Sequence, residues 1–174
     1  MTEKRGAGNI VVADAGPLIH LDELGVLDLL SDFAEVWIPR AVMRELERHR
    51  PAALSNNKVP WVRRDLPTTE RLAALASVYT LHAGEQAALA LCMAHPEALL
   101  LTDDTAARLA AQTLALRAHG TLGLLIRAER RGQLRRVEVL ALLQQIPLRS
   151  SLHIRPSLLR EIIQQVAEAP DSAQ

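Results

Sequence analysis

The sequence predicts a three-layer α/β/α sandwich built on a central, mostly parallel β-sheet. Three short runs, Ile10–Ala13, Glu35–Ile38 and residues 98–101, have the length and the aliphatic or β-branched content of buried strands. Each run is followed by a segment in which apolar residues recur with helical spacing. Short apolar strands that alternate with helices are typical of a parallel sheet covered by helices on both faces.

Composition restricts the classes of protein that fit this sequence. The 174 residues are 49% hydrophobic, which is enough for one domain with a real core and excludes a disordered chain. The 20 Lys and Arg side chains balance the 20 Asp and Glu side chains, so any binding of nucleic acid must depend on local patches. The single cysteine, Cys92, excludes a disulfide framework and a cysteine zinc site.

We expect a flexible leader over residues 1–9, one domain over 10–166 and a flexible tail over 167–174. No apolar run approaches the ~20 residues of a membrane span, and Asp14 interrupts the first run too early for a signal peptide. The sequence therefore predicts a cytoplasmic protein that does not enter a membrane.

The individual elements are expected where the apolar spacing changes and where Gly, Pro or Thr can start or stop a helix. In the first half these are a strand at Ile10–Ala13, a tight Gly16-Pro17 turn with Pro17 in the first turn of the helix that follows, two short helices divided by Gly25, a strand at Glu35–Ile38, a helix over 39–48, and a loop over 50–67 with an extended stretch at 59–62. In the second half they are a helix from Thr68 or Thr69 to about Leu81, an apolar helix over 85–94, a strand over 98–101, a helix at Thr105–Thr113, a short strand over 114–116, and helices over 121–132, 137–145 and 156–166.

Acidic side chains stand at positions where apolar surroundings make a carboxylate costly. Asp14 and the pair Asp103 and Asp104 each follow an apolar strand, so they project from one sheet edge if those strands are parallel neighbours. Glu45 shares a helical face with apolar residues, and Glu85 starts the apolar helix. Converging carboxylates repel one another, and an oxygen-rich site of this kind suits Mg²⁺ or Mn²⁺ with a phosphate substrate. The implied chemistry is metal-dependent hydrolysis of phosphodiester bonds.

Each of these acids also has a structural interpretation. Asp14 can be a turn residue, Glu85 can stabilise a helix N-terminus, and Glu45 can be a solvated ion-pair partner. Asp103 or Asp104 can cap the helix that follows them. Only their combination at one edge favours a functional site.

Other phosphate chemistries fit the sequence less well. It contains no Gly-x-x-x-x-Gly-Lys-Ser/Thr loop, which disfavours a P-loop nucleotidase. A phosphoaspartyl receiver domain also places acids at strand ends, but the two lysines, Lys4 and Lys58, are poorly placed to serve as its partner lysine.

Four segments, in order, resemble the PIN-domain family: VVADAGPLI at 11–19, IPRAVMREL at 38–46, GEQAALAL at 84–91 and LTDD at 101–104. The downstream AHGTLGLLI at 118–126 is similar to a bacterial PIN subfamily. The resemblance covers nearly the whole of residues 10–166 and implies a PIN-like fold.

The resemblance implies a divalent-metal-dependent endoribonuclease that uses Mg²⁺ or Mn²⁺. Many bacterial members are VapC-like toxins of type II toxin–antitoxin pairs, so the expected partners are an RNA substrate, a small antitoxin protein and a second copy of the chain. Residue by residue, Asp14, Glu45 and Glu85 match the first three acids of the family, and Asp104 matches the fourth, with Asp103 as a further metal ligand beside it. Which of Asp103 and Asp104 faces the metal stays open, as do the number of ions and the RNA target.

Arginine side chains are the expected contacts for the RNA. The densest group is Arg127, Arg130, Arg131, Arg135 and Arg136, although a solvated helix face explains this group better than RNA binding does. Backbone N–H groups at 120–123 can bind a phosphate, and an ordinary helix start explains them as well. Aromatic residues make up 2% of the chain, which excludes extensive base stacking. The alternative to a ribonuclease is a PIN-like binding or regulatory module with weak or no catalysis.

Overall fold

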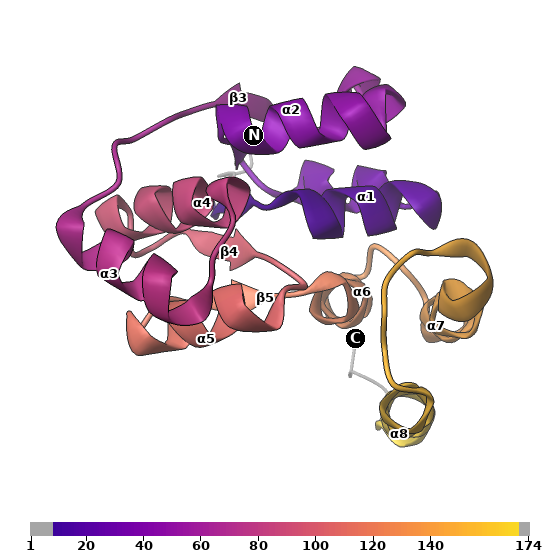
Figure 1. Ribbon diagram of the computed structural model, residues 1–174. Coiled ribbons are helices and arrows are strands. Elements are labelled where there is room, and N and C mark those ends of the chain that lie inside the picture. Colours follow the sequence, from indigo (N-terminus) through magenta and orange to yellow (C-terminus); the bar gives the residue numbers. More distant parts are fainter. Residues whose placement is uncertain (1–8, 171–174) are drawn as a thin grey trace, which may run out of the picture.

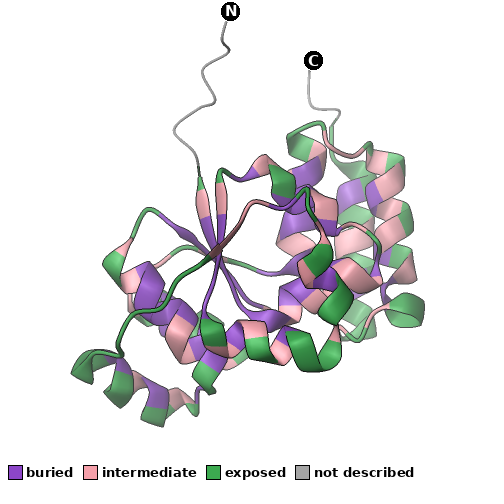
Figure 2. Cartoon of the chain, turned by 90° about the horizontal axis from the view of Figure 1, so that it is seen from above, coloured by how far each residue is buried: buried purple, intermediate pink, exposed green. Residues whose placement is uncertain are grey.

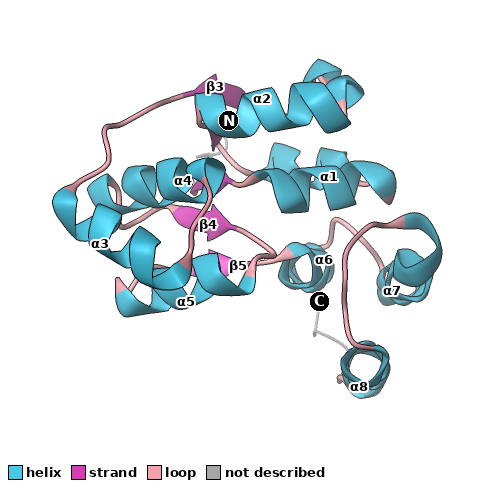
Figure 3. Ribbon diagram, in the orientation of Figure 1, coloured by secondary structure: helices cyan, strands magenta, loops and turns pink. Residues whose placement is uncertain are grey.

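The computed structural model describes residues 9–170 and has the predicted α/β/α architecture (Figures 1 and 3). Within that range a parallel sheet has the strand order β3-β2-β1-β4-β5. Its strands are β1 (Ile10–Ala13), β2 (Glu35–Ile38), β3 (Trp61–Arg63), β4 (Leu99–Leu101) and β5 (Ala118–His119). All four strand pairings are parallel, as the apolar strands separated by helices predicted.

Two apolar layers cover the two faces of the sheet, because side chains alternate along each strand. Val11 and Ala13 face a core shared with one group of helices, whereas Val12 faces the other. The first group comprises α1 (Ala15–Glu23), α2 (Arg40–His49), α6 (Thr121–Arg130) and α7 (Arg136–Arg149). The second group comprises α3 (Glu70–Tyr79), α4 (Ala83–Ala94) and α5 (Thr105–Thr113). Figure 2 shows the buried strands enclosed by helices whose outer faces are exposed.

The C-terminal helix α8 (Pro156–Glu168) packs against α7 (Figure 1). Its buried side chains, Leu159 and Val166, join the same core as α1 and α6. The helix begins at Pro156, where a missing N–H costs nothing.

Several helix boundaries agree with the signals in the sequence. Thr69 Oγ1 accepts a hydrogen bond from the Leu72 N–H at 3.2 Å and caps α3 as predicted. α4 is buried along most of its length, as its apolar sequence predicted. Pro17 lies in the first turn of α1 as predicted, but α1 begins at Ala15, directly after Asp14, so the separate turn predicted at Gly16 is wrong.

The predicted strand over residues 114–116 is also wrong. These residues end α5, because Ala115 adopts a left-handed conformation with φ of 55° and Leu116 N–H bonds to the Ala111 carbonyl at 2.9 Å. The edge strand β5 comes two residues later. A short 3₁₀ helix at Leu27–Asp32 takes the place of the second predicted short helix. Another at Pro51–Ser55 lies within the predicted loop.

The predicted leader over 1–9 and tail over 167–174 lie mainly outside the described residues. Ala167 and Glu168, expected in the tail, form the last turn of α8. Between residues 9 and 170 no helix is long and apolar enough to cross a membrane.

Candidate functional site

Asp14 lies where the two central strands end together. β1 and β4 are parallel neighbours with Ala13 opposite Leu101, and Asp14 N–H donates to the Leu101 carbonyl at 2.9 Å. The Asp14 side chain is 8% exposed, and its Oδ2 accepts a hydrogen bond from the buried Thr102 hydroxyl at 3.3 Å. The predicted meeting of the first acid with the end of the fourth strand is therefore present.

Three of the predicted acids line one pocket of about 410 Å³ at this edge. Asp14 follows β1, Glu45 comes from α2 and Glu85 comes from the first turn of α4. The remaining lining residues are Ala41, Arg48, His49, His82, Ala83 and Gly84. Residues separated by up to 71 positions in the chain thus converge on one space.

Gly84 allows α4 to approach the other two elements closely. A Cβ at this position would stand 3.3 Å from Asp14 Oδ1, 3.3 Å from Val42 Cγ2 and 3.7 Å from Glu45 Oε2. The free oxygen of Asp14 and the Glu45 carboxylate therefore face the same space in front of Gly84. A side chain here would partly fill it.

The pKa of Asp14 is raised to about 7, chiefly by burial and in addition by the negative charges of Glu85 and Glu45. Hydrogen bonds from the Ala15 N–H and the Thr102 hydroxyl lower it by less. A carboxyl group that is held partly protonated near neutral pH will ionise readily when a cation comes near.

Glu85 has a structural role as well as its place in the pocket. Its Oε2 accepts a hydrogen bond from the His82 N–H at 2.8 Å in a capping box, and His82 Nδ1 lies 3.5 Å from its other oxygen. Glu85 is 8% exposed. The helix-start interpretation of Glu85 is therefore correct, and the same carboxylate also faces Asp14 across the pocket.

Glu45 makes no ion pair with Arg44 or Arg48, although the sequence allowed one. Arg48 Nε instead donates to the Arg44 carbonyl at 3.3 Å. Together with Ala41, Glu45 faces the pocket, as the helical spacing predicted.

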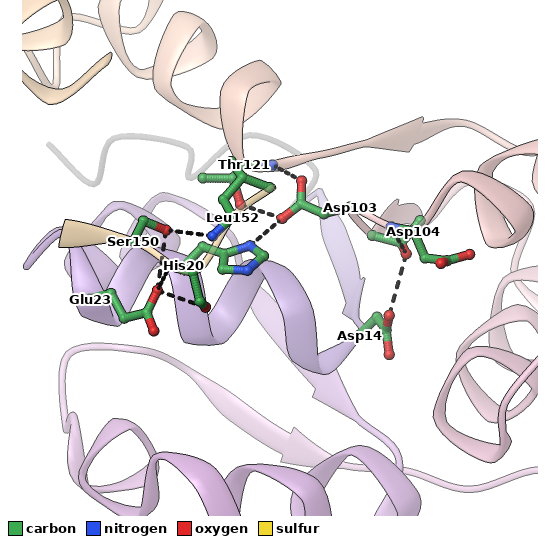
Figure 4. A network of polar contacts seen from close by, with 10 residues as sticks. Asp14, His20, Glu23, Asp103, Asp104, Thr121, Ser150 and Leu152 are labelled. Atoms are coloured by element: carbon green, nitrogen blue, oxygen red, sulfur yellow. Dashed lines mark hydrogen bonds and ion pairs between the residues drawn. The ribbon is translucent and has the colours of Figure 1, made fainter. Parts of the chain in front are cut away.

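The structure does not bring Asp103 into this pocket. His20 Nδ1 donates to its Oδ2 at 2.7 Å, and Thr121 donates to it through both its N–H at 2.7 Å and its hydroxyl at 2.6 Å (Figure 4). Burial by itself raises the pKa of Asp103, but these hydrogen bonds from His20 and Thr121 outweigh it and keep the pKa low. Asp103 thus joins the end of β4 to α1 and α6.

Asp104 is exposed and caps α5. Its Oδ1 accepts a hydrogen bond from the Ala107 N–H at 2.8 Å, while its own N–H donates to the Thr102 hydroxyl at 3.2 Å. In Figure 4 the Asp104 carboxylate lies to one side of Asp14 and does not point toward it. Thr102 is the link between the two acids, since it contacts the Asp14 carboxylate and the Asp104 backbone.

The donor set of the pocket fits a hard divalent cation. Carboxylate oxygens from Asp14, Glu45 and Glu85 face one water-accessible space, and Asp14 Oδ1 lies on its Gly84 side. Among residues 9–170, no three His, Cys, Asp or Glu side chains already stand close enough to form a ready-made ligand cluster. An ion here would keep several waters, as Mg²⁺ usually does.

Sequence reasoning missed the polar side chains that orient the acids. Thr102 and Thr121 are fully buried, and His20 stands one helical turn after Gly16. A polar residue at the end of an apolar strand was a visible signal for Thr102. The partner of His20 was not visible, because it depends on how α1, β4 and α6 meet.

A family model described as a PIN domain matches residues 10–168, which is nearly the full chain. The chain belongs to the PIN-domain family. No curated protein matches the sequence. PIN domains are generally nucleases that use divalent metal ions, and their substrates are nucleic acids. The carboxylate pocket of this PIN domain lies at the sheet edge where parallel α/β folds bind their ligands.

Proposed function

We propose that this PIN domain is a divalent-metal-dependent endoribonuclease. The observation that carries the proposal is the convergence of Asp14, Glu45 and Glu85 on one pocket at the carboxyl edge of the sheet. A structural role alone explains Glu85, but it does not explain why a buried Asp14 faces two further carboxylates.

Asp14, Glu45 and Glu85 would hold Mg²⁺ or Mn²⁺, with Asp104, which is joined to Asp14 through Thr102, as the fourth acid at this edge. When bound, the ion supplies an activated water and offsets the charge that develops on the phosphodiester. Thr102 donates to Asp14 Oδ2 and so fixes the carboxylate with Oδ1 toward the pocket. The Glu85 carboxylate is held in place by the His82 N–H, and the missing side chain of Gly84 keeps the space open for the substrate phosphate.

The test is cleavage of a labelled single-stranded RNA by the purified protein with Mg²⁺, with Mn²⁺ and with EDTA. We expect cleavage only with a metal, and a loss of roughly 100-fold or more for Asp14→Asn or Glu45→Gln. Glu47→Gln is the matched control, because Glu47 is exposed on the same helix as Glu45 and lies outside the pocket. Equal cleavage by wild type and Asp14→Asn would refute the assignment. A DNA strand of the same sequence tests the preference for RNA.

A PIN-like binding module without catalysis is the second candidate function. It is favoured by Asp103 and Asp104, both of which are engaged in hydrogen bonds that stabilise helix starts. This candidate predicts RNA binding with no metal-dependent cleavage, and it is excluded if EDTA abolishes a cleavage activity that Asp14→Asn also lacks.

A toxin role, an antitoxin partner and a homodimer are separate parts of the proposal, and they rest on the family resemblance. Growth arrest on expression of wild type, but not of Asp14→Asn, supports the toxin role. Light scattering on the purified chain tests the dimer. Normal growth during strong expression of an active enzyme would leave a nuclease that is not a toxin.

A further inference from the structure

The densest arginine group in the sequence is largely neutralised within the molecule. Arg127 and Arg131 pair with Asp32 at 2.8 and 3.1 Å, Arg136 pairs with Glu129 at 2.8 Å, and Arg135 pairs with Glu138 at 3.2 Å. These arginines tie α6 and α7 to neighbouring elements. A basic surface for a polyanion must therefore be sought elsewhere.

A second groove, of about 700 Å³, lies between β5, the start of α6 and the segment that enters α8. It is lined by basic side chains from three parts of the chain: Arg108 on α5, His119 on β5, and His153 and Arg155 before α8. No described carboxylate pairs with Arg108 or Arg155. The acid in the lining is Asp103, whose oxygens already accept bonds from His20 and Thr121.

Gly120 and Gly123, at the start of α6, have no side chains, and this allows Arg108 and His119 to approach the backbone there closely. A Cβ on Gly120 would stand 2.5 Å from Asp103 Oδ1 and 3.6 Å from Arg108 Nη1. A Cβ on Gly123 would stand 2.9 Å from His119 Nδ1. Larger residues at either position would displace Asp103 or His119, so the groove depends on both glycines.

The local charge is positive although the net charge of the chain is zero. Burial lowers the pKa of His119, and the positive charges of four arginines lower it further: Arg127, Arg108, Arg117 and Arg130. Of these, only Arg127 has a carboxylate partner in the described part of the chain. The lowered pKa favours neutral His119, so the positive charge of the groove comes from Arg108 and Arg155, which outnumber the one lining carboxylate, Asp103, and suit the groove to an anion.

The groove adjoins the carboxylate pocket across the connection from β4 to α5. Asp103 lines the groove, while the preceding residue, Thr102, bonds to Asp14 in the pocket. In Figure 4 the Asp103 carboxylate points toward His20 and Thr121, away from Asp14. A chain of phosphates that has one phosphate at Asp14 can continue into the groove.

The other lining residues of the groove are aliphatic: Leu122, Leu152, Ile154, Leu158 and Ile162. An unpaired nucleotide presents a charged backbone and an apolar base face, and this groove offers a partner to each. A duplex hides its base faces within the stack and presents chiefly phosphates and sugars. The mixed lining therefore favours a single strand.

We propose that this groove, lined by Arg108, His119, His153 and Arg155, binds the backbone of the single-stranded RNA segment that flanks the scissile phosphate. The inference rests on the proposed ribonuclease function and adds to it the path of the substrate. Its affinity comes from phosphate contacts with Arg108 and Arg155, while the aliphatic wall contacts the bases.

The test is fluorescence anisotropy of a labelled single-stranded RNA with the full chain in EDTA, which prevents cleavage. We expect Arg108→Glu/Arg155→Glu to weaken binding by about tenfold or more and to reduce the slope of log K against log salt concentration. The matched control is Arg63→Glu/Arg71→Glu, which makes the same change of charge at exposed positions on β3 and α3. The control should bind within about twofold of wild type, apart from a general charge effect common to both.

The outcomes separate this proposal from the function on which it rests. A wild type that cleaves RNA, together with groove and control variants that bind alike, overturns the groove and leaves the nuclease. A wild type that neither binds nor cleaves RNA overturns both. Equal or tighter binding of duplex RNA overturns the single-strand assignment. Arg108→Lys/Arg155→Lys keeps the charge, so it should bind like wild type, and its loss of binding would overturn the electrostatic argument even if the Glu variant misfolds.

Discussion

At the scale of single residues, the site is defined by how each carboxylate is satisfied. Asp103 receives short hydrogen bonds from His20 and Thr121 and has a low pKa, whereas Asp14 is buried, receives bonds only from the Ala15 N–H and the Thr102 hydroxyl among the described residues, and has a pKa of about 7. Two acids at neighbouring strand ends thus have opposite properties. Asp103 is stable as an anion without a ligand, while ionised Asp14 needs a cation.

Replacement of Asp14 should therefore stabilise the metal-free protein at alkaline pH. The folded-state pKa of Asp14 lies above the ordinary value of 3.8. The free energy of unfolding therefore decreases as pH rises from about 4 to about 7, and the full decrease persists at higher pH. In EDTA, we expect Asp14→Asn to be more stable than wild type by on the order of 2 kcal/mol at pH 8, with little difference at pH 4. Urea unfolding at both pH values measures this, and a larger deficit of the variant at pH 8 than at pH 4 would contradict it.

Asp103 and Asp104 should respond differently to the same substitution. Asp103→Asn removes the charge that accepts bonds from His20 and Thr121, and should cost about 1–3 kcal/mol of stability. Asp104→Asn keeps a good helix cap and should change stability by less than about 0.5 kcal/mol. Thermal unfolding distinguishes the two variants. A loss of cleavage in a stable Asp104→Asn protein would then identify a functional carboxylate, and an equal loss of stability in both would refute the assigned roles.

At the scale of elements, two helices end in a strained backbone conformation that is maintained by hydrogen bonds. α3 and α5 each end with a non-glycine residue in the left-handed conformation, Thr80 with φ of 56° and Ala115 with φ of 55°. In both cases the next N–H closes the helix by bonding to a carbonyl five residues back, from Leu81 to Ala76 and from Leu116 to Ala111. The hydrogen bonds maintain a conformation that Thr and Ala adopt reluctantly.

Glycine at the end of α3 should stabilise the protein. Thr80 is exposed, and Thr80→Gly removes the left-handed strain, so we expect a gain of up to about 1 kcal/mol in the free energy of unfolding. Ala74→Gly, at an exposed position inside the same helix, should instead cost about 1 kcal/mol. If both glycines destabilise equally, the strain argument is wrong.

At the scale of the whole molecule, Glu23 of α1 holds the segment between α7 and α8 in addition to the apolar core that these helices share with α1. Glu23 Oε2 accepts hydrogen bonds from the Ser151 N–H at 2.6 Å, the Ser151 hydroxyl at 3.0 Å and the Ser150 hydroxyl at 3.1 Å (Figure 4). Burial alone raises the pKa of Glu23, but the bonds from these two serines make the net shift downward. This attachment fixes the segment that supplies His153 and Arg155 to the groove.

Loss of this attachment should depend on pH. The lowered pKa of Glu23 contributes stability that is fully present above the ordinary glutamate value of 4.5, and this contribution disappears as pH falls through the folded-state value. We expect Glu23→Gln to cost about 1 kcal/mol at pH 7 and nothing near pH 2. Glu47→Gln serves as the exposed control in the same denaturation series. A cost that persists unchanged at low pH would show that the charge of Glu23 is not involved.

The sequence was sufficient to predict which acids lie at the carboxyl edge of the sheet. It was not sufficient to predict the side chains that contact them. Asp14 could be placed because a β-branched run, an acid and a helix start stand next to each other, and Glu45 because helical spacing fixes its face. The different surroundings of Asp103 and Asp104 could not be predicted. They depend on His20 and Thr121, which lie on two different helices and both bind Asp103. Arg108 and Arg155 gave no local signal, because their common groove exists only after α8 has packed.

The strand order β3-β2-β1-β4-β5 also has a consequence for the time at which activity can arise. β1 pairs with β2 on one edge and with β4, from residues 99–101, on the other. Contacts between such distant segments form late, because a long loop must close before they stabilise anything. A growing chain would thus complete its first three strands with Asp14 at an unfinished edge. The enzyme would be inert while it is being made, and it would acquire its site only when the second half of the chain closes the sheet.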